Sequence, residues 1–500
     1  MGKLQDAKAS LMGTIDTIRE NEKDPAKMKL KEYIAYALGK LSYGSIAKLA
    51  SDYLNVYYIS AGFSPERAGK LTAATRLFDS LNDPVVSTII DNGKGKKGRF
   101  KPYLAPLVIP LAVLSIFMFI KPPFASLNTL MYWCFFTYAV WETINTFSGV
   151  SFGAIATVMS ADKQERTLYT TIGNIGNQFA GTVPGLIPFL YPLLTQPDHP
   201  EKGIPDYLFY TICAVAFAVI GGSTGMFTRN LQERVTPPKS QEHFWDSFVT
   251  FFKNKNLILL WSADLSGVIG SAGAAANQEF YRHSLGRFEL QGVQWALAGA
   301  PHTIAISLAP LLLKRIRATR LIIFTNLLSA GCHLAAYFIV KPIGYATLPG
   351  IILIMFFTVI AWIPQGIGGV AKEILKMNTF DYTEMQTGQR AEATSLMVTG
   401  VLSKWVGSIA ALVGGYAMKY IGFQSPDADG PFAGVPKPQT LGAKNGLFFI
   451  FLMFPAIGAL LSAIPTFFFK LEGPEFDRTI AEFRERRAEL EKAEEEMAEV

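Results

Sequence analysis

Long apolar runs constrain the fold of this chain more than any other feature of its sequence. Windows of about 19 residues place these runs near 33–60, 68–92, 102–121, 128–158, 169–192, 206–228, 256–280, 290–313, 319–341, 345–371, 391–421 and 445–470. A helix of about 20 apolar residues is long enough to cross a bilayer. Half of the 500 residues are hydrophobic and 17% are charged, which excludes a disordered chain, a collagen-like repeat and a disulfide scaffold. We therefore predict an all-α membrane protein with twelve transmembrane helices.

Basic residues in short loops predict the orientation of these helices. They are Lys94, Lys96, Lys97, Arg99 and Lys101 in one loop, and Lys314, Arg315, Arg317 and Arg320 in another. The positive-inside rule places both loops, and with them both termini, in the cytoplasm. The net charge of +6 is mild and indicates no nucleic-acid partner. We expect a multi-pass protein of the plasma membrane, of the bacterial inner-membrane type.

A polar stretch at 229–255, with Pro237 and Pro238, divides the runs six and six. Strongly basic loops follow the second and the eighth run, which suggests two related halves. We predict a cytoplasmic N-terminal segment (1–32), two six-helix bundles (33–228 and 256–470) joined by a cytoplasmic linker (229–255), and a cytoplasmic C-terminal helix (471–500).

Three charges lie within the second apolar run. Arg76, Asp79 and Asp83 are spaced three and four residues apart, so they share one helical face. Each charge at membrane depth costs about 2.5–3.5 kcal/mol on insertion scales. Two carboxylates one turn apart repel each other until a cation or a proton binds, and Asn82 adds a neutral oxygen. The pattern predicts a cation-coupling site; the alternative is an ion pair of Arg76 with an aspartate that locks two helices.

The eleventh run contains an isolated cation, Lys404. Such an ammonium is expected to reach a carboxylate on another helix, with Asp79 and Asp83 as candidates; the alternative is that it snorkels to the interface. The chain contains neither a Walker-type phosphate loop nor an HExxH pair. We therefore predict no enzymatic activity and no cofactor.

Five motifs resemble those of the glycoside–pentoside–hexuronide:cation symporter family. They are Arg76-x-x-Asp79-x-x-Asn82-Asp83-Pro84, Gly98-Arg99-Phe100-Lys101-Pro102, Asp162-Lys163-Gln164-Glu165-Arg166, Phe251-Phe252-Lys253-Asn254 and Thr387-Gly388-Gln389-Arg390. The resemblance spans both halves of the chain. It implies a major facilitator fold, in which sodium or a proton binds on helix two and drives sugar uptake by alternating access, and it suggests a monomer in the lipid bilayer.

The resemblance also assigns roles to individual residues. Asp79 and Asp83 would be the ligands of the cation, which is sodium or a proton, and Asn82 would lie close by. A threonine of helix four near the family's cation site falls on Thr146. Lys404 would be the positive charge near this site, and coupling would involve Arg76 as well.

The sugar-binding positions of the family differ in this sequence. The acid and the tryptophan of helix four fall on Gly149 and Gly153, and an arginine of helix five falls on Asn174. The coupling residues are therefore kept while the recognition surface has changed.

Other polar residues offer a replacement recognition surface. On helix one, Lys48 and Asp52 share a stripe near Tyr43, and they predict either an i, i+4 ion pair or a contact with an anionic group of the solute. Glu142 is expected either to line the cavity or to hydrogen-bond a neighbouring helix. Trp405 is expected either to stack on a sugar face or to pack against other side chains. The second half offers Asp264, Asn277, Gln278, Glu279, His302 and His333.

These observations predict a symporter that couples inward sodium or proton movement to the uptake of a glycoside, sugar or hexuronide-like solute. One alternative is a cation-coupled carrier of lysolipids or of other amphipathic or anionic solutes. A second, of a different class, is a membrane receptor or scaffold that does not transport.

Overall fold

The computed structural model describes residues 27–92, 98–123, 126–160, 163–197, 202–235, 251–252, 254–387, 392–430, 433–473, 476, 478–480 and 482. Most of the predicted N-terminal segment, the centre of the predicted linker and most of the predicted C-terminal helix lie outside the described residues. So do eight residues of the motifs and basic loops: Lys94, Lys96, Lys97, Asp162, Lys253, Gly388, Gln389 and Arg390.

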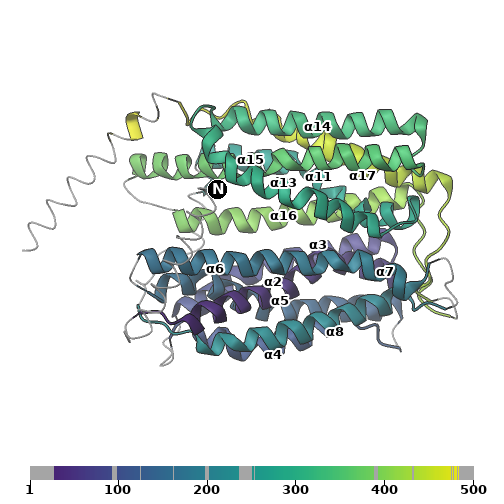
Figure 1. Ribbon diagram of the computed structural model, residues 1–500, viewed down its shortest axis with the longest axis horizontal. Helices are drawn as coiled ribbons and strands as arrows, with labels where there is room; N and C mark the ends of the chain where they lie inside the picture. Colours follow the sequence, from purple (N-terminus) through teal and green to yellow (C-terminus); the bar gives the residue numbers. More distant parts are fainter. Residues whose placement is uncertain are drawn as a thin grey trace, which may run out of the picture. The chain divides into compact units, whose positions relative to one another are not determined.

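The described chain is helical, and every predicted apolar run contains a helix (Figure 1). The first part of the chain forms α2 (Leu30–Ser60), α3 (Pro65–Asn92), α4 (Ala105–Met118), α5 (Leu127–Val158), α6 (Lys163–Thr182), α7 (Ile187–Thr195) and α8 (Asp206–Gly225), with short 3₁₀ turns η1 (Lys101–Tyr103), η2 (Val183–Leu186) and η3 (Met226–Asn230). The second part forms α10 (Lys255–Ser266), α11 (Val268–Ala272), α12 (Ala274–Glu279), a π turn η4 (Phe280–Ser284), α13 (Glu289–Leu313), α14 (Ala318–Ile343), α15 (Leu348–Thr387), α16 (Glu392–Tyr420) and α17 (Leu441–Thr466). The predicted all-α class is confirmed for the described residues.

Eight of the described helical segments are long and apolar enough to cross a membrane. The long helices outside this set are α2, α3, α5 and α6, and they carry many of the polar residues singled out above. Charged and amide side chains on these four helices lower their mean hydropathy. Twelve crossings and cytoplasmic termini are consistent with the helix order and stay predictions.

The chain divides into two compact units, and α3 contributes to both. The first unit comprises Met1–Ser64, Leu81–Gln241 and Ser425–Lys437. The second comprises Pro65–Ser80, Glu242–Gln424 and Pro438–Val500. The predicted domain boundaries stay a prediction.

In the first unit, α2 packs against α6 and α8, and α4 packs against α5 and α8. Glycines allow the closest approach, because a Cβ added to Gly176 of α6 would lie 2.2 Å from the carbonyl oxygen of Ala37 on α2. Aromatic rings fill the contact beyond it, where Tyr36 and Tyr169 stack with ring centroids 3.8 Å apart. These contacts fix the rotation of α2, the helix that carries Tyr43 and Lys48.

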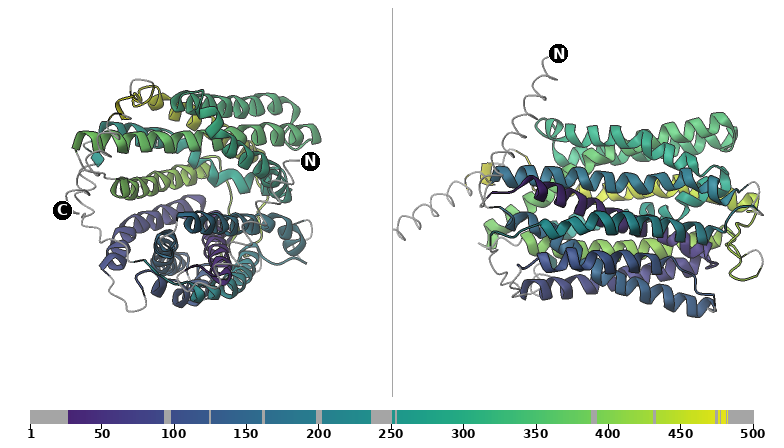
Figure 2. Two further views of the ribbon diagram at one scale, coloured as in Figure 1. Left: turned by 60° about the vertical axis from the view of Figure 1, so that its left-hand side comes forward. Right: turned by 60° about the horizontal axis from the view of Figure 1, so that its bottom comes forward.

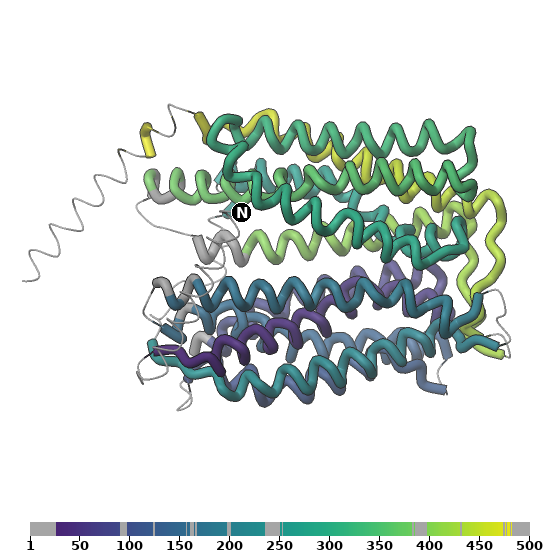
Figure 3. The backbone as a smooth tube through the Cα atoms, viewed as in Figure 1, coloured from purple at the N-terminus to yellow at the C-terminus, as the bar shows by residue number. Residues whose placement is uncertain are grey.

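In the second unit, α14 packs against α15 and α17, and α13 packs against α15. The chain turns between Ile343 and Leu348, so α14 and α15 run antiparallel, as the backbone trace shows (Figure 3). Two further views show α14 and α15, in green, running alongside each other (Figure 2). This layer supplies one side of the cavity described below.

The seventh predicted run, 256–280, is interrupted rather than continuous. It forms α10, α11, α12 and η4, with turns at Gly267 and Gly273 between the three α-helical segments. Gly270 of α11 lies close to α17, because a Cβ added to Gly458 would lie 2.5 Å from the Gly270 Cα. Glycine removes the side chains that would prevent this contact, and breaks of this kind at membrane depth are tolerated where they line a cavity.

Candidate functional site

A cluster of polar side chains joins α3 to α5 within the first unit. The Asn82 side-chain nitrogen donates to the Thr146 hydroxyl at 3.0 Å, and the Thr146 hydroxyl lies 3.3 Å from Asp83 Oδ1. Thr146 also lies 3.5 Å from Glu142 Oε1. We call the six residues of this group the Thr146 cluster: Asn82, Asp83, Glu142, Thr143, Asn145 and Thr146.

The Thr146 hydroxyl carries one proton, while the carboxylates of Asp83 and Glu142 both lie within hydrogen-bond distance of it. A hydroxyl donates only one hydrogen bond, so it cannot serve both carboxylates fully at once. Glu142 and Thr146 are buried, with 7% and 6% of their surface exposed. Asp83 is partly buried. Carboxylate and hydroxyl oxygens grouped in this way are the ligands that a hard cation prefers.

Two members of the cluster, Thr143 and Asn145, were not singled out from the sequence. Thr143 Oγ1 contacts Asn82 Oδ1 at 3.3 Å, and the Asn145 amide donates to Glu142 Oε2 at 3.0 Å. Both positions lie within three residues of Glu142 or Thr146 on α5. A search for hydroxyl and amide residues three or four positions from Glu142 and Thr146 would have found them.

The other predicted coupling residues lie in the second unit. Asp79, one turn before Asp83 on α3, is 5% exposed. The Arg76 guanidinium lies against the bare backbone of α16, because a Cβ added to Gly407 would lie 2.1 Å from Arg76 Nη1. Lys404 is partly buried on the same helix. Arg76 therefore contacts a second helix. Its predicted pairing with an aspartate and the partner of Lys404 both stay predictions.

Trp405 helps to hold the first half of α3 against α16. Its indole Nε1 donates to Ser80 Oγ at 3.0 Å, and the Ser408 hydroxyl donates to the Ala73 carbonyl at 3.2 Å. The polar end of the indole is thus held by Ser80. Whether its ring stacks on the solute or only packs against other side chains stays a prediction.

On α2, the predicted i, i+4 ion pair is present. Lys48 Nζ lies 2.8 Å from Asp52 Oδ1, and the Lys48 side chain is 47% exposed. An exposed pair of this kind contributes about 0.3–0.5 kcal/mol to stability. Lys48 is therefore open to a further anionic partner at small energetic cost to the helix.

The three positions that are predicted to correspond to sugar-binding residues of the family have different surroundings. A Cβ added to Gly149 would lie 2.4 Å from the Tyr43 hydroxyl, so Tyr43 fills the space beside this glycine. Gly153 faces open space, with nothing within 4 Å of an added Cβ. Asn174 is exposed on α6. The structure thus brings Tyr43 and Gly149 together.

The second unit contains a cavity of about 540 Å³, which we call the amide cavity. Its lining includes the indoles of Trp295 and Trp362, and the polar side chains of Asp264, Asn277, Gln294, Asn326, His333 and Gln365. Of these, Asp264, Asn277 and His333 were singled out from the sequence, and the structure brings them to one cavity. The remaining lining residues meet only because α10–α12, α13, α14 and α15 pack together.

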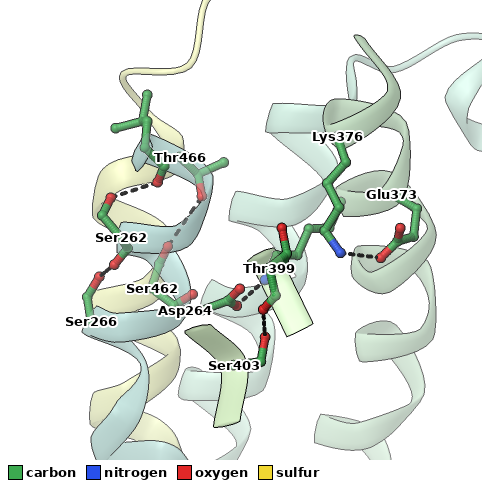
Figure 4. Close-up of polar contacts among 11 residues, drawn as sticks. Ser262, Asp264, Ser266, Glu373, Lys376, Thr399, Ser403, Ser462 and Thr466 are labelled. Carbon is green, nitrogen blue, oxygen red and sulfur yellow. Dashed lines mark hydrogen bonds and ion pairs between the residues drawn. The ribbon is translucent and has the colours of Figure 1, made fainter. Parts of the chain in front are cut away.

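Other candidates of the second half have structural partners. Glu279 is fully buried and pairs with Arg282 at 3.3 Å and with His283 at 3.1 Å across the π turn. His302 stacks on Trp362 with ring centroids 4.8 Å apart, and its Nδ1 lies 3.1 Å from the Trp362 carbonyl. Asp264 lies beside Ser262 and Ser266 on α10, near Ser462 of α17 (Figure 4).

Comparison with known proteins assigns the family. A family model described as MFS/sugar transport protein matches residues 35–473. The chain belongs to the MFS/sugar transport protein family. Membership of the glycoside–pentoside–hexuronide symporter family, predicted from the motifs, is thereby confirmed. Proteins of the MFS/sugar transport protein family are transporters and not enzymes, as predicted.

Two curated relatives and one solved structure illustrate the match. The uncharacterized symporter YjmB of Bacillus subtilis (strain 168) is 27% identical over 89% of this chain and 93% of the relative. The glucuronide carrier protein homolog of Escherichia coli (strain K12) is 22% identical over 92% of this chain and 97% of the relative. The crystal structure of a D-xylose-proton symporter has a TM-score of 0.57 at 13% identity, covering 88% of this chain and 97% of that one. This structural likeness confirms the predicted major facilitator fold.

Proposed function

We propose that this protein is a symporter that uses an inward sodium or proton gradient to take up a glycoside, sugar or hexuronide-like solute. The observation that carries this proposal is the Thr146 cluster, in which two carboxylates share one hydroxyl. A cluster of this chemistry is stabilised by binding a cation. Family membership supports solute transport as the process that such binding drives.

The coupling step follows from the charges. Without a cation, Asp83 and Glu142 repel each other and compete for the Thr146 proton. A bound sodium ion or proton neutralises part of this charge and lets α3 and α5 adopt a different packing. Asp79, one turn away on α3, is the second ligand that the resemblance implies, and Arg76 and Lys404 would be released from the aspartates as the cation binds.

Relatives support the class of solute. The glucuronide carrier homolog points to hexuronides, and the family description points to sugars in general. Lys48 offers a cation for a carboxylate on such a solute. The lysolipid alternative and the receptor alternative have no comparable support among these relatives. A monomer in the plasma membrane, with both termini in the cytoplasm, is the arrangement that the basic loops and the resemblance favour.

Reconstituted vesicles test the proposal directly. Wild-type protein is expected to accumulate labelled methyl glucuronide, methyl galactoside or methyl xyloside when an inward sodium gradient or an inward proton gradient is imposed, and the gradient that works identifies the ion. The variant Asp83→Cys is expected to lose accumulation. A matched control is Asp427→Asn, because Asp427 forms an exposed ion pair with Lys437 outside the cluster. Full gradient-driven accumulation by Asp83→Cys would show that the proposed coupling site is wrong.

A further inference from the structure

We propose that the amide cavity of the second unit binds a neutral, hydroxylated sugar ring of the transported solute, an inference that rests on the proposed function. The cavity is lined by residues of α10–α12, α13, α14, α15 and α17. Its volume of about 540 Å³ lies within the range of about 300–1,000 Å³ that is usual for small-molecule sites. The cavity is therefore large enough for a sugar ring with part of an attached group.

A buried acceptor in this cavity lacks a hydrogen-bond donor. Asn277 Oδ1 is shielded from solvent, and the described part of the chain provides no hydrogen-bond partner for it. Leaving a buried polar atom unsatisfied costs about 1–3 kcal/mol. A solute hydroxyl placed in the cavity would donate to this oxygen and remove that penalty.

Neighbouring groups are held in orientations that suit hydroxyl groups. The Tyr281 hydroxyl donates to Gln294 Oε1, and Gln294 Nε2 donates to Thr358 Oγ1 at 2.8 Å. An amide nitrogen has two hydrogens, so Gln294 keeps one donor for a ligand. His333 Nδ1 lies 2.8 Å from the Ser329 carbonyl, which assigns the proton of a neutral ring to Nδ1 and leaves Nε2 as an acceptor. The cavity thus offers both donors and acceptors, as a polyol requires.

Two tryptophans supply apolar surface beside these polar groups of the cavity. Trp362 and Trp295 both line the cavity, and stacking on His302 fixes the plane of the Trp362 indole. Small-molecule sites combine such aromatic surfaces with a few polar groups that fix orientation. A sugar ring presents C–H groups on its faces and hydroxyls at its edge, which matches indoles combined with amides.

Charge distinguishes a neutral ring from a uronate here. Among the lining residues that the structure describes, none is lysine or arginine. The carboxylate of Asp264 forms an ion pair with Lys372 of α15, so this acid is already neutralised. A carboxylate of the solute would lose its hydration in this cavity, and the nearby Lys372 ammonium is already paired with Asp264. The cavity therefore selects the uncharged part of the solute.

Equilibrium binding to the purified full-length protein tests this assignment. The probes are the methyl pyranosides of glucose, galactose and xylose, together with methyl glucuronide, whose single ring carries a carboxylate. At least one neutral probe is expected to bind, and methyl glucuronide is expected to bind at least about tenfold more weakly. Trp362→Leu and Asn277→Leu are each expected to lower the affinity for the neutral probe about tenfold. Trp362→Phe, which keeps an aromatic ring, is expected to bind the probe within about threefold of wild type.

Two controls keep the outcome interpretable. Phe356→Leu changes an exposed ring on α15 outside the cavity lining and is expected to leave binding unchanged. Stabilisation of each variant by the coupling cation alone, measured by thermal unfolding, is expected to match wild type, which shows that the variant is folded. Binding of no neutral probe, or unchanged affinity in both Trp362→Leu and Asn277→Leu, would overturn the assignment. Gradient-driven accumulation of solute by the wild type is measured separately. If the wild type accumulates solute while Trp362→Leu and Asn277→Leu bind the neutral probe with wild-type affinity, the proposed function stands and this inference fails.

Discussion

The Thr146 cluster and the amide cavity are both polar regions among apolar helices, yet they differ in every other respect. The cluster contains two carboxylates, and its side chains contact one another directly. The cavity is hollow, lined by amides and indoles, and its one carboxylate is paired. Two carboxylates around one hydroxyl offer oxygen ligands to a cation, whereas neutral donors and acceptors around a space suit a neutral polar molecule. The cluster therefore suits the coupling cation of a symporter, and the cavity suits its organic solute.

Two variants, one in each region, test whether the Thr146 cluster binds the cation and the amide cavity binds the organic solute. Asp83→Asn is expected to lower cation affinity about 100-fold, since hydrogen bonds to charged groups contribute about 1.5–3 kcal/mol, and to leave cation-independent solute binding within about threefold. Asn277→Leu is expected to show the reverse pattern. Cation-induced thermal stabilisation and equilibrium binding of the methyl pyranosides measure the two affinities. If each variant lost affinity for the cation and for the methyl pyranoside to the same extent, separate roles for the two regions would be contradicted.

Lys48 tests whether an anionic group is recognised outside the amide cavity. Lys48→Ala is expected to abolish uptake of an anionic glycoside and to spare a neutral one, because only the anionic solute needs the ammonium. Initial uptake rates in vesicles for a disaccharide that joins a uronate to a neutral ring, and for methyl galactoside, provide the comparison. Lys48→Arg, which keeps the charge, serves as the control. An equal loss of both rates would mean that the pair with Asp52 has only a structural role.

Glu142 tests how many carboxylates the cluster needs. Glu142→Gln keeps the size of the side chain and removes its charge, so we expect cation affinity to fall about tenfold while solute affinity stays unchanged. The cation concentration that gives half-maximal uptake reports this change. Glu373→Gln, in a surface pair with Lys376, is the matched control. An unchanged half-maximal concentration would restrict the cation site to the aspartates of α3.

The smallest effect is expected at the two glycines of α5. Gly149→Ala forces the Tyr43 phenol to move and is expected to destabilise the protein by about 1–3 kcal/mol. At Gly153 an added methyl group would extend into open space. Gly153→Ala is therefore expected to leave the free energy of unfolding unchanged or to raise it by up to about 1 kcal/mol. Thermal unfolding of the two variants side by side measures the difference. Equal melting temperatures would contradict the close contact of Tyr43 with Gly149.

Hydropathy was sufficient to place the helices, because each predicted run, from 33–60 to 445–470, contains helical structure. It did not reveal the breaks at Gly267 and Gly273, since glycine leaves the mean hydropathy of a window high while it alters the packing. The link between Thr146 and Asp83 was predicted from the family motifs, and the structure places the two side chains in contact.

The amide cavity could not be predicted in the same way. Asn277, Gln294 and Gln365 lie on three different helical segments, and no local pattern relates them. Their convergence depends on how α12, α13 and α15 pack. The i, i+4 pair of Lys48 and Asp52 is the opposite case, because a single helix determines that contact. Contacts within one helix, and the Thr146–Asp83 contact that the family motifs imply, were thus predictable. A cavity formed by residues of several helices was not.

The contact between Tyr43 and Gly149 also has an evolutionary consequence. Glycine becomes aspartate through a single nucleotide change, so an acid at position 149 is genetically close. The Tyr43 ring occupies the space such a side chain would need, whereas the space beside Gly153 is open. A mutation at position 153 would therefore be tolerated whatever residue stands at position 43. An acid at position 149 would require the Tyr43 ring to move or a smaller residue to replace it, so the effect of that mutation depends on one aromatic ring.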